Sequence, residues 1–225
     1  MGARRTLLAA AGLTAVAALL TATSASAAGS AAQAGNVLTY GSATGPAVAV
    51  GDVLTSSLSS GTTVAIRTAV GGTTGITCTA SQFTAAVTAN PTAPGAATES
   101  VTAHTFGGCS SNIFGTTGVQ SIILGNLPYV ATAASAGTLD VTVGTAGPIR
   151  TTVTLNTILG VMVCGYTSAG LSGTTSNTDN SITFANQLFT KSTGPLTCPS
   201  SSYFSAKYAP VQDTSQSGSP SVFVN

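Results

Sequence analysis

The sequence predicts an all-β protein, a β-sandwich or a related antiparallel β architecture, with two pseudo-repeated halves that each contain one disulfide. Three observations predict this fold class. Short runs of alternating apolar and polar residues recur along the chain, and clusters of Gly, Pro, Asn and Ser separate them. Four cysteines follow an N-terminal export signal. Beyond that signal, no stretch has the apolar spacing of a helix.

The first 27 residues have the features of a signal peptide. Two arginines form a basic start, an apolar run covers 7–20, and Ala25-Ser26-Ala27 is a small-x-small cleavage site. The run of about 14 residues is shorter than the roughly 20 that span a bilayer. The Arg4–Arg5 pair matches the twin-arginine consensus only in part, so general secretion and twin-arginine export both stay open. We expect a secreted, extracellular product in which residues 28–225 form a single β-rich domain without a transmembrane segment.

The expected strands follow from the alternation. In chain order they cover residues 37–40, 47–54, 62–68, 83–88, 100–106, 119–124, 138–143, 149–155, 158–164, 181–184, 203–208 and 221–224. Turn residues separate them at a spacing typical of sandwiches.

Two of these strands are expected to form a hairpin. The run 138–143 places Leu139, Val141 and Val143 on one face, the cluster 144–148 is rich in turn residues, and 149–155 continues the alternation. Asp140 and Arg150 are then expected to lie close together on the outer face. An exposed pair of this kind contributes at most about 1 kcal/mol.

The segment Ile158–Cys164 is apolar on both faces. This pattern predicts a central strand that is buried between two layers.

The four cysteines are Cys78, Cys109, Cys164 and Cys198. Loosely similar segments follow Cys78 and Cys164, which favours the pairs Cys78–Cys109 and Cys164–Cys198 among three possible connectivities. An exported chain with an even number of cysteines is normally oxidised.

Charged side chains are scarce outside the signal peptide. The basic residues are Arg67, Arg150, Lys191 and Lys207, and the acidic residues are Asp52, Glu99, Asp140, Asp179 and Asp213. Four minus five gives a net charge near −1. Four scattered cations do not form the basic patch that nucleic acids or anionic membranes require, so we expect neither partner.

Several segments are familiar from known sequences. They are residues 75–83 (GITCTASQF), 126–129 (NLPY), 181–184 (SITF), 189–191 (FTK) and 222–225 (VFVN). Together they resemble a family of small secreted actinobacterial proteins that are β-rich and have no assigned function. The resemblance begins at about Gly75 and implies secretion and a β fold. That family has no known catalytic residues, so the resemblance implies no mechanism.

Candidate catalytic groups are few. His104 is the only histidine, so a Ser-His-Asp triad would depend on it, yet no Gly-x-Ser-x-Gly turn is present. Asp213-Thr214-Ser215 is similar to the catalytic turn of aspartic proteases, but a second such turn is missing. A glycosidase needs two facing carboxylates. We place Glu99 in a loop and Asp140 on a solvent-exposed face, which does not favour such a pair.

Binding sites are equally hard to identify. The segment Asn177–Asn180 has oxygen ligands that suit calcium, although Asx residues also simply favour turns. Four tyrosines either line a shallow binding surface or, as we favour, fill the edges of the core: Tyr129, Tyr166, Tyr203 and Tyr208. The sequence therefore predicts no catalytic residues, no metal site and no cofactor.

The expected function is that of a secreted, non-enzymatic protein that binds an unidentified extracellular or cell-envelope ligand. A self-assembling extracellular structural protein is one alternative, because Thr-rich strands with few charges leave sheet edges unguarded. A secreted hydrolase is a weaker alternative.

Overall fold

β-Strands and turns make up the described part of the chain, which is residues 35–225 of a computed structural model. No helix occurs within this range, in agreement with the predicted all-β class. The expected signal peptide, residues 1–27, lies outside the described residues.

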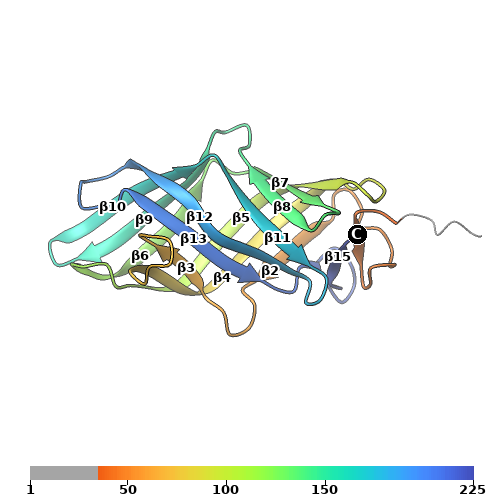
Figure 1. Cartoon of the computed structure of the whole chain (residues 1–225), viewed down its shortest axis with the longest axis horizontal. Helices are drawn as coiled ribbons and strands as arrows, with labels where there is room; N and C mark the ends of the chain where they lie inside the picture. Colours follow the sequence, from red (N-terminus) through yellow and green to blue (C-terminus); the bar gives the residue numbers. More distant parts are fainter. Residues whose placement is uncertain (1–34) are drawn as a thin grey trace, which may run out of the picture. The chain divides into compact units, whose positions relative to one another are not determined.

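Residues 35–225 contain fifteen strands, most of which are labelled in Figure 1. They are β1 Leu38–Tyr40, β2 Val53–Ser57, β3 Val64–Arg67, β4 Gly75–Ala89, β5 Ala96–Ser111, β6 Thr116–Gly125, β7 Tyr129–Ala134, β8 Thr138–Thr142, β9 Ile149–Thr157, β10 Gly160–Ser168, β11 Gly170–Ser176, β12 Ser181–Thr193, β13 Ser201–Tyr208, β14 Gln212–Asp213 and β15 Val222–Val224.

Eight strands close into a barrel. Strand β11 pairs with both β8 and β12, which joins the two ends of the order β8-β7-β5-β4-β3-β13-β12. Every pairing is antiparallel, so the fold is a related antiparallel architecture of the kind expected. Closure leaves these strands without free edges.

Further strands extend the barrel. Strand β12 also pairs with β10, which continues to β9 and then to β6. Strand β2 pairs with β4 and β14, and β1 pairs with β15. In Figure 1 β6, β9 and β10 lie toward one end of the barrel, whereas β7, β8 and β11 lie toward the other.

Alternation of side chains builds the core. In β8 the apolar Leu139 and Val141 are buried, whereas Thr138, Asp140 and Thr142 are exposed. Strand β13 alternates in the same way and buries Phe204 and Tyr208. Successive side chains of a strand point to opposite faces, so each strand of the ring contributes one row of side chains to the interior.

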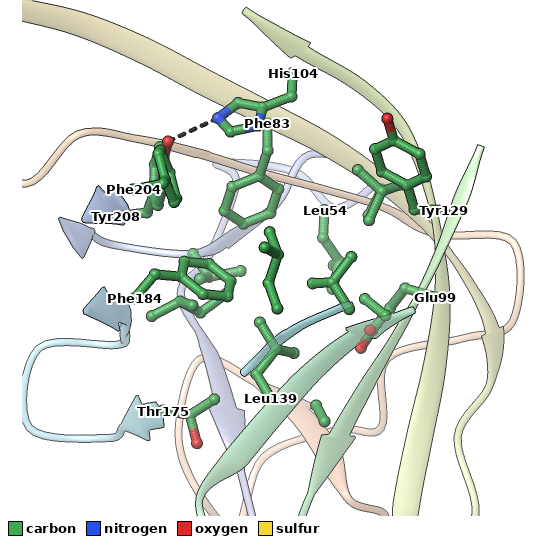
Figure 2. Close-up of a pocket in the computed structure, with 18 of the residues that line it drawn as sticks. Leu54, Phe83, Glu99, His104, Tyr129, Leu139, Thr175, Phe184, Phe204 and Tyr208 are labelled. Atoms are coloured by element: carbon green, nitrogen blue, oxygen red, sulfur yellow. Dashed lines mark hydrogen bonds between the residues drawn. The ribbon is translucent and has the colours of Figure 1, made fainter. Parts of the chain in front are cut away.

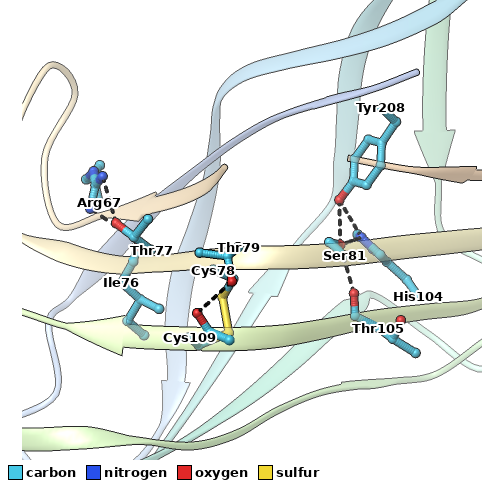
Figure 3. The surroundings of a disulfide bond; sticks show 11 residues. Arg67, Ile76, Thr77, Cys78, Thr79, Ser81, His104, Thr105, Cys109 and Tyr208 are labelled. Atoms are coloured by element: carbon cyan, nitrogen blue, oxygen red, sulfur yellow. Dashed lines mark hydrogen bonds between the residues drawn. A yellow bond between two sulfur atoms is a disulfide. The ribbon is translucent and has the colours of Figure 1, made fainter. Parts of the chain in front are cut away.

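Both disulfides have the predicted pairing. Cys78 and Cys109 are joined between β4 and β5, as Figure 3 shows. Cys164 of β10 is joined to Cys198 in the loop before β13.

The predicted hairpin between residues 138–143 and 149–155 is wrong. Strand β8 pairs with β7 and β11, whereas β9 pairs with β10 and β6. Asp140 therefore accepts a hydrogen bond from Ser172 Oγ at 2.7 Å and does not pair with Arg150. Only one local bridge, between Gly144 and Gly147, closes the turn. Alternation gives the face of each strand but does not identify its partner.

The predicted buried strand at Ile158–Cys164 is also wrong. Ile158 and Leu159 form the exposed turn between β9 and β10, with exposed fractions of 74% and 95%. Val161 and Val163 lie on the outer face of β10, and Cys164 is buried on the inner face. A continuous apolar run thus combines a turn with a strand whose outer face is apolar.

Candidate ligand-binding site

A cavity of about 130 Å³ lies inside the barrel. Figure 2 shows apolar side chains from β2, β4, β8, β12 and β13 converging on it. They include Leu54, Phe83, Leu139, Phe184 and Phe204. An engineered cavity of about 150 Å³ with this kind of lining stays dry and binds benzene. The cavity therefore has the size and chemistry to hold one small apolar molecule.

Glu99 is the only carboxyl group among the described residues that line this cavity. It lies on β5 between Val87 of β4 and Ala131 of β7. Its exposed fraction is 5%, and no residue within 35–225 forms a hydrogen bond with its carboxyl group. Desolvation by burial raises the pKa of Glu99 to about 8. At neutral pH the group is therefore mainly a protonated acid.

The predicted loop position of Glu99 is wrong. Strand β5 begins at Ala96, directly after the Pro94–Gly95 turn, and its inward positions include Ala97, Glu99 and Val101. An acidic residue at an inward position interrupts the apolar–polar alternation. The sequence pattern therefore placed the start of this strand at residue 100, whereas it begins at Ala96.

A polar cluster of Ser81, His104 and Tyr208 lies in the barrel wall, and His104 and Tyr208 also line the cavity. Ser81 Oγ donates to the Thr105 carbonyl at 2.7 Å and lies 2.9 Å from Tyr208 Oη. Tyr208 Oη lies 2.7 Å from His104 Nε2, and Figures 2 and 3 show this contact. Because the Ser81 proton is directed to a backbone carbonyl, we assign Tyr208 as the donor to Ser81 Oγ and the Nε2–H of neutral His104 as the donor to Tyr208 Oη.

This cluster does not have the geometry of a hydrolytic triad. Ser81 lies 3.1 Å from His104 Nε2, but its hydroxyl is buried and donates elsewhere. No carboxylate within the described residues forms a hydrogen bond with His104. Burial lowers the pKa of His104 to about 4 and raises the pKa of Tyr208, so both are neutral at pH 7. The three side chains satisfy one another and hold β4, β5 and β13 together.

A pair of acids joins β2 to the C-terminal segment. Asp213 is fully buried, and its Oδ1 accepts from the Ser215 amide at 3.0 Å. Its Oδ2 has no hydrogen-bond partner within the described range. Desolvation and the nearby Asp52 carboxylate raise the pKa of Asp213. Asp52 in turn accepts from the Ala49 amide at 2.9 Å and from Gln216 Nε2 at 3.1 Å.

The turn at Asp213-Thr214-Ser215 therefore serves as a tie between strands. Thr214 Oγ1 donates to the Val53 carbonyl at 2.9 Å, and the Val53 amide donates to Ser215 Oγ at 2.8 Å. These hydrogen bonds hold the turn against β2, so the hydroxyl groups of Thr214 and Ser215 have a structural role.

The possible calcium loop at Asn177–Asn180 holds the C-terminal strand. Asn177 exchanges two hydrogen bonds with the backbone of Val224, at 2.7 and 2.9 Å, and Asn180 Nδ2 donates to the Val222 carbonyl at 2.8 Å. Asp179 forms an ion pair with Lys207 at 2.5 Å. Within residues 35–225, no group of three or more His, Cys, Asp or Glu side chains is placed to hold a metal ion.

The other sequence candidates are separated by the barrel wall. Asp140 is exposed on β8, as expected, whereas Glu99 faces the interior, so the two carboxyl groups do not face one another across a site. Tyr129, Tyr166 and Tyr208 are buried and line the cavity, which agrees with the favoured core position. Tyr203 is partly buried. Ser81 was not among the residues singled out from the sequence, because nothing local distinguishes it from the other serines.

Comparisons with known proteins give no relatives: no family model, no curated protein and no solved structure matches this chain. Among the strands and turns of residues 35–225, no helix has the length and apolar character that a membrane span requires.

Proposed function

We propose that this protein is a secreted, non-enzymatic binding protein that takes a small apolar ligand from its extracellular or cell-envelope surroundings into the barrel. The observation that carries the proposal is the cavity of about 130 Å³ with its almost wholly apolar walls. Burial of a ligand against such walls contributes about 25 cal/mol for each Å² of apolar surface removed from water. Secretion, and the resemblance to secreted actinobacterial proteins, belong to the same proposal.

The chemistry of the interior supports binding more than turnover. Ser81, His104 and Tyr208 are held by one another, and Ser81 already donates to a backbone carbonyl. Glu99 is the one carboxyl group among the described residues that line the cavity, so the wall lacks the pair of acids that glycoside hydrolysis uses. The few scattered cations also make nucleic acid an improbable partner on electrostatic grounds.

Binding of toluene tests this proposal. We expect toluene to raise the melting temperature of the oxidised protein and to shift NMR signals of cavity residues. Ala133→Leu places three additional carbons at a buried, cavity-lining position and should abolish the effect. Ala89→Leu is the matched control, because Ala89 is exposed on β4 and outside the cavity lining. Equal toluene binding by both variants, or no binding by the wild type, would contradict the proposal.

Self-association with a second copy is the second candidate, and a specific observation favours it. Three loops at one end carry exposed apolar side chains: Phe114 at 100%, Leu159 at 95% and Leu196 at 98%. The loops adjoin, since the Ile158 amide donates to the Gly115 carbonyl at 3.2 Å and Thr197 Oγ1 contacts Met162 Sδ at 3.2 Å. Apolar groups gathered in this way mark interaction surfaces.

The same end also has an open sheet edge. Strand β6 forms a ladder with β9 alone, and Ile123 on β6 is 60% exposed. An unpaired edge is a template for another chain. Sedimentation over a range of concentrations tests this candidate. Leu159→Ser should weaken any oligomer, and Thr88→Ser serves as an exposed control. A monomer at every concentration would eliminate this candidate.

A further inference from the structure

Glu99 lines the cavity, and its carboxyl group forms no hydrogen bond with any residue of the described range 35–225. Its carboxyl group points into the cavity in Figure 2, and its exposed fraction is 5%. Burying a polar group without a hydrogen bond costs roughly 1–3 kcal/mol in protein mutational data. The cost is offset when a ligand in the same cavity supplies the missing partner.

Several polar groups in or beside the cavity wall form hydrogen bonds with partners other than Glu99. Tyr208, Ser81 and His104 bond one another. Tyr129 Oη donates to the Gly125 carbonyl and accepts from the Arg150 amide at 3.1 Å. None of these hydrogen bonds includes Glu99.

None of the four basic side chains in residues 35–225 bonds to Glu99: Arg150 is exposed on β9, and the other three have other partners. Lys207 pairs with Asp179, Lys191 Nζ donates to two backbone carbonyls, and Arg67 donates to the Ile76 carbonyl and to Thr77. No ion pair within the described residues includes Glu99. Within residues 35–225 no side chain bonds to its carboxyl group, whereas a molecule bound in the cavity could do so.

We propose that Glu99 is the polar anchor of the cavity and that the ligand is a small uncharged molecule with an apolar body and a single carbonyl oxygen, which accepts a hydrogen bond from the Glu99 carboxyl group. This inference rests on the proposed function, because it specifies the ligand of the same cavity.

The chemistry of the wall selects this ligand class. A buried protonated carboxyl is a strong O–H donor, and a carbonyl oxygen is its simplest complement. An anionic ligand would meet no cation in the wall. A cationic amine would have to lose its hydration and ionise Glu99 in an apolar cavity, and the desolvation of two charges often exceeds their attraction. The burial that raises the Glu99 pKa to about 8 keeps the donor proton in place at neutral pH.

Three ligands of nearly equal shape test the inference: cyclohexanone, methylenecyclohexane and cyclohexylamine. They carry a carbonyl oxygen, an apolar methylene group and a cationic nitrogen on the same ring. Affinities are measured by NMR titration at pH 6 for the wild type, Glu99→Met and Glu99→Gln. Methionine keeps the length of the side chain without the polar group, and glutamine keeps a donor.

We expect the ratio of affinities for cyclohexanone over methylenecyclohexane to be about five- to tenfold higher in the wild type than in Glu99→Met, as for one hydrogen bond. The preference should persist in Glu99→Gln. At pH 9.5 the wild type should lose it through ionisation of Glu99, whereas Glu99→Gln should retain it. This pH comparison also serves if Glu99→Met does not fold.

Three other results would reject the role of Glu99, the uncharged ligand class, or the cavity site as a whole. Equal ratios in all variants, with methylenecyclohexane bound, would overturn the role of Glu99 and leave the apolar cavity site standing. Tightest binding of cyclohexylamine to the wild type would overturn the uncharged class. If no ring binds and Ala133→Leu has no effect on any titration, the cavity is not a ligand site, and both proposals fail.

Discussion

Cys78 and Cys109 are directly opposite residues in the ladder between β4 and β5, so their disulfide joins two strands that already pair. Cys198 lies in the loop between β12 and β13, and its disulfide ties that loop to Cys164 on β10. The first bridge reinforces a wall of the barrel, and the second anchors a loop at the end where β10 lies.

Loss of either disulfide should destabilise the protein. The bridged residues are separated by 31 and 34 positions. For closed loops of this length the chain-entropy model gives about 3.5–4 kcal/mol each. Replacing both cysteines of one bridge by alanine should therefore lower the melting temperature by roughly 7–15 °C. Thermal unfolding followed by circular dichroism checks this. An unchanged melting temperature after verified reduction of the wild type would show that the bridges carry no stability.

The sequence predicted the inward and outward faces of many strands but not the closure of the barrel. The alternation at 138–142 and 203–208 is visible in the sequence and agrees with the burial. Strands β7 and β11 were not expected, because Ala, Thr, Gly and Ser dominate both. These two strands complete the ring, since β11 joins β8 to β12. Pairing between strands far apart in sequence depends on the packing of the whole interior, which no local pattern encodes.

The candidate site could not be predicted from the sequence for a related reason. A cavity is the difference between the space inside the ring and the summed volume of the side chains that enter it, so no single residue signals its presence. Glu99 was noted as one of five acids. Predicting that its side chain points inward would have required knowing that β5 starts at Ala96. His104 was noted, whereas its partners Ser81 and Tyr208 come from strands distant in sequence.

Glu99 and His104 should give the stability of the protein an unusual pH profile. The folded pKa of Glu99 is raised from 4.5 to about 8, so its favourable contribution is complete below pH 4.5 and is lost as the pH rises to 8. The folded pKa of His104 is lowered from 6.5 to about 4, so its contribution is complete above pH 6.5 and is lost as the pH falls to 4. Between pH 4.5 and 6.5 the two effects oppose one another, and between 6.5 and 8 the His104 contribution is constant, so of these two groups only Glu99 changes the stability.

Urea unfolding at several pH values checks the two contributions separately. The wild type should lose about 2 kcal/mol between pH 6.5 and 8, at about 1.4 kcal/mol for each pH unit. In Glu99→Gln this loss should vanish, and stability should instead rise between pH 4 and 6.5 because the His104 effect is unopposed. In His104→Gln stability should fall from pH 4.5 upward. Parallel profiles for all three proteins would contradict the burial of these groups.

Tyr208→Phe tests the polar cluster in the barrel wall. The substitution keeps the ring, which packs edge-on against Phe83 with centroids 5.4 Å apart, and removes only the hydroxyl. Ser81 and His104 then lose a buried hydrogen-bond partner, which should cost about 1–3 kcal/mol. Tyr40→Phe is the control, because Tyr40 is partly buried on β1 and has no side-chain hydrogen bond within the described residues. Equal stability of the two variants in urea would mean that the cluster contributes nothing.

Asp213→Asn should stabilise the protein as the pH rises. Asp213 is fully buried, and desolvation together with the Asp52 carboxylate raises its pKa. A raised folded pKa means that the contribution of Asp213 is complete below its ordinary pKa of 3.8 and is lost as the pH rises through the folded value. Asparagine keeps the oxygen that accepts from the Ser215 amide, and its amide can donate to the Asp52 carboxylate.

A hydrogen bond to a charged group contributes about 1.5–3 kcal/mol, so the variant should exceed the wild type by this order at pH 8 and match it near pH 3. Asp179→Asn is the contrasting control, because Asp179 pairs with Lys207 near the surface and its pKa is lowered. Its substitution should lower stability at pH 8 only slightly, because an exposed ion pair contributes little. A difference between Asp213→Asn and the wild type that stays constant from pH 3 to pH 8 would show that the two carboxyl groups do not interact, and the tie between β2 and the C-terminal segment would then depend on backbone hydrogen bonds alone.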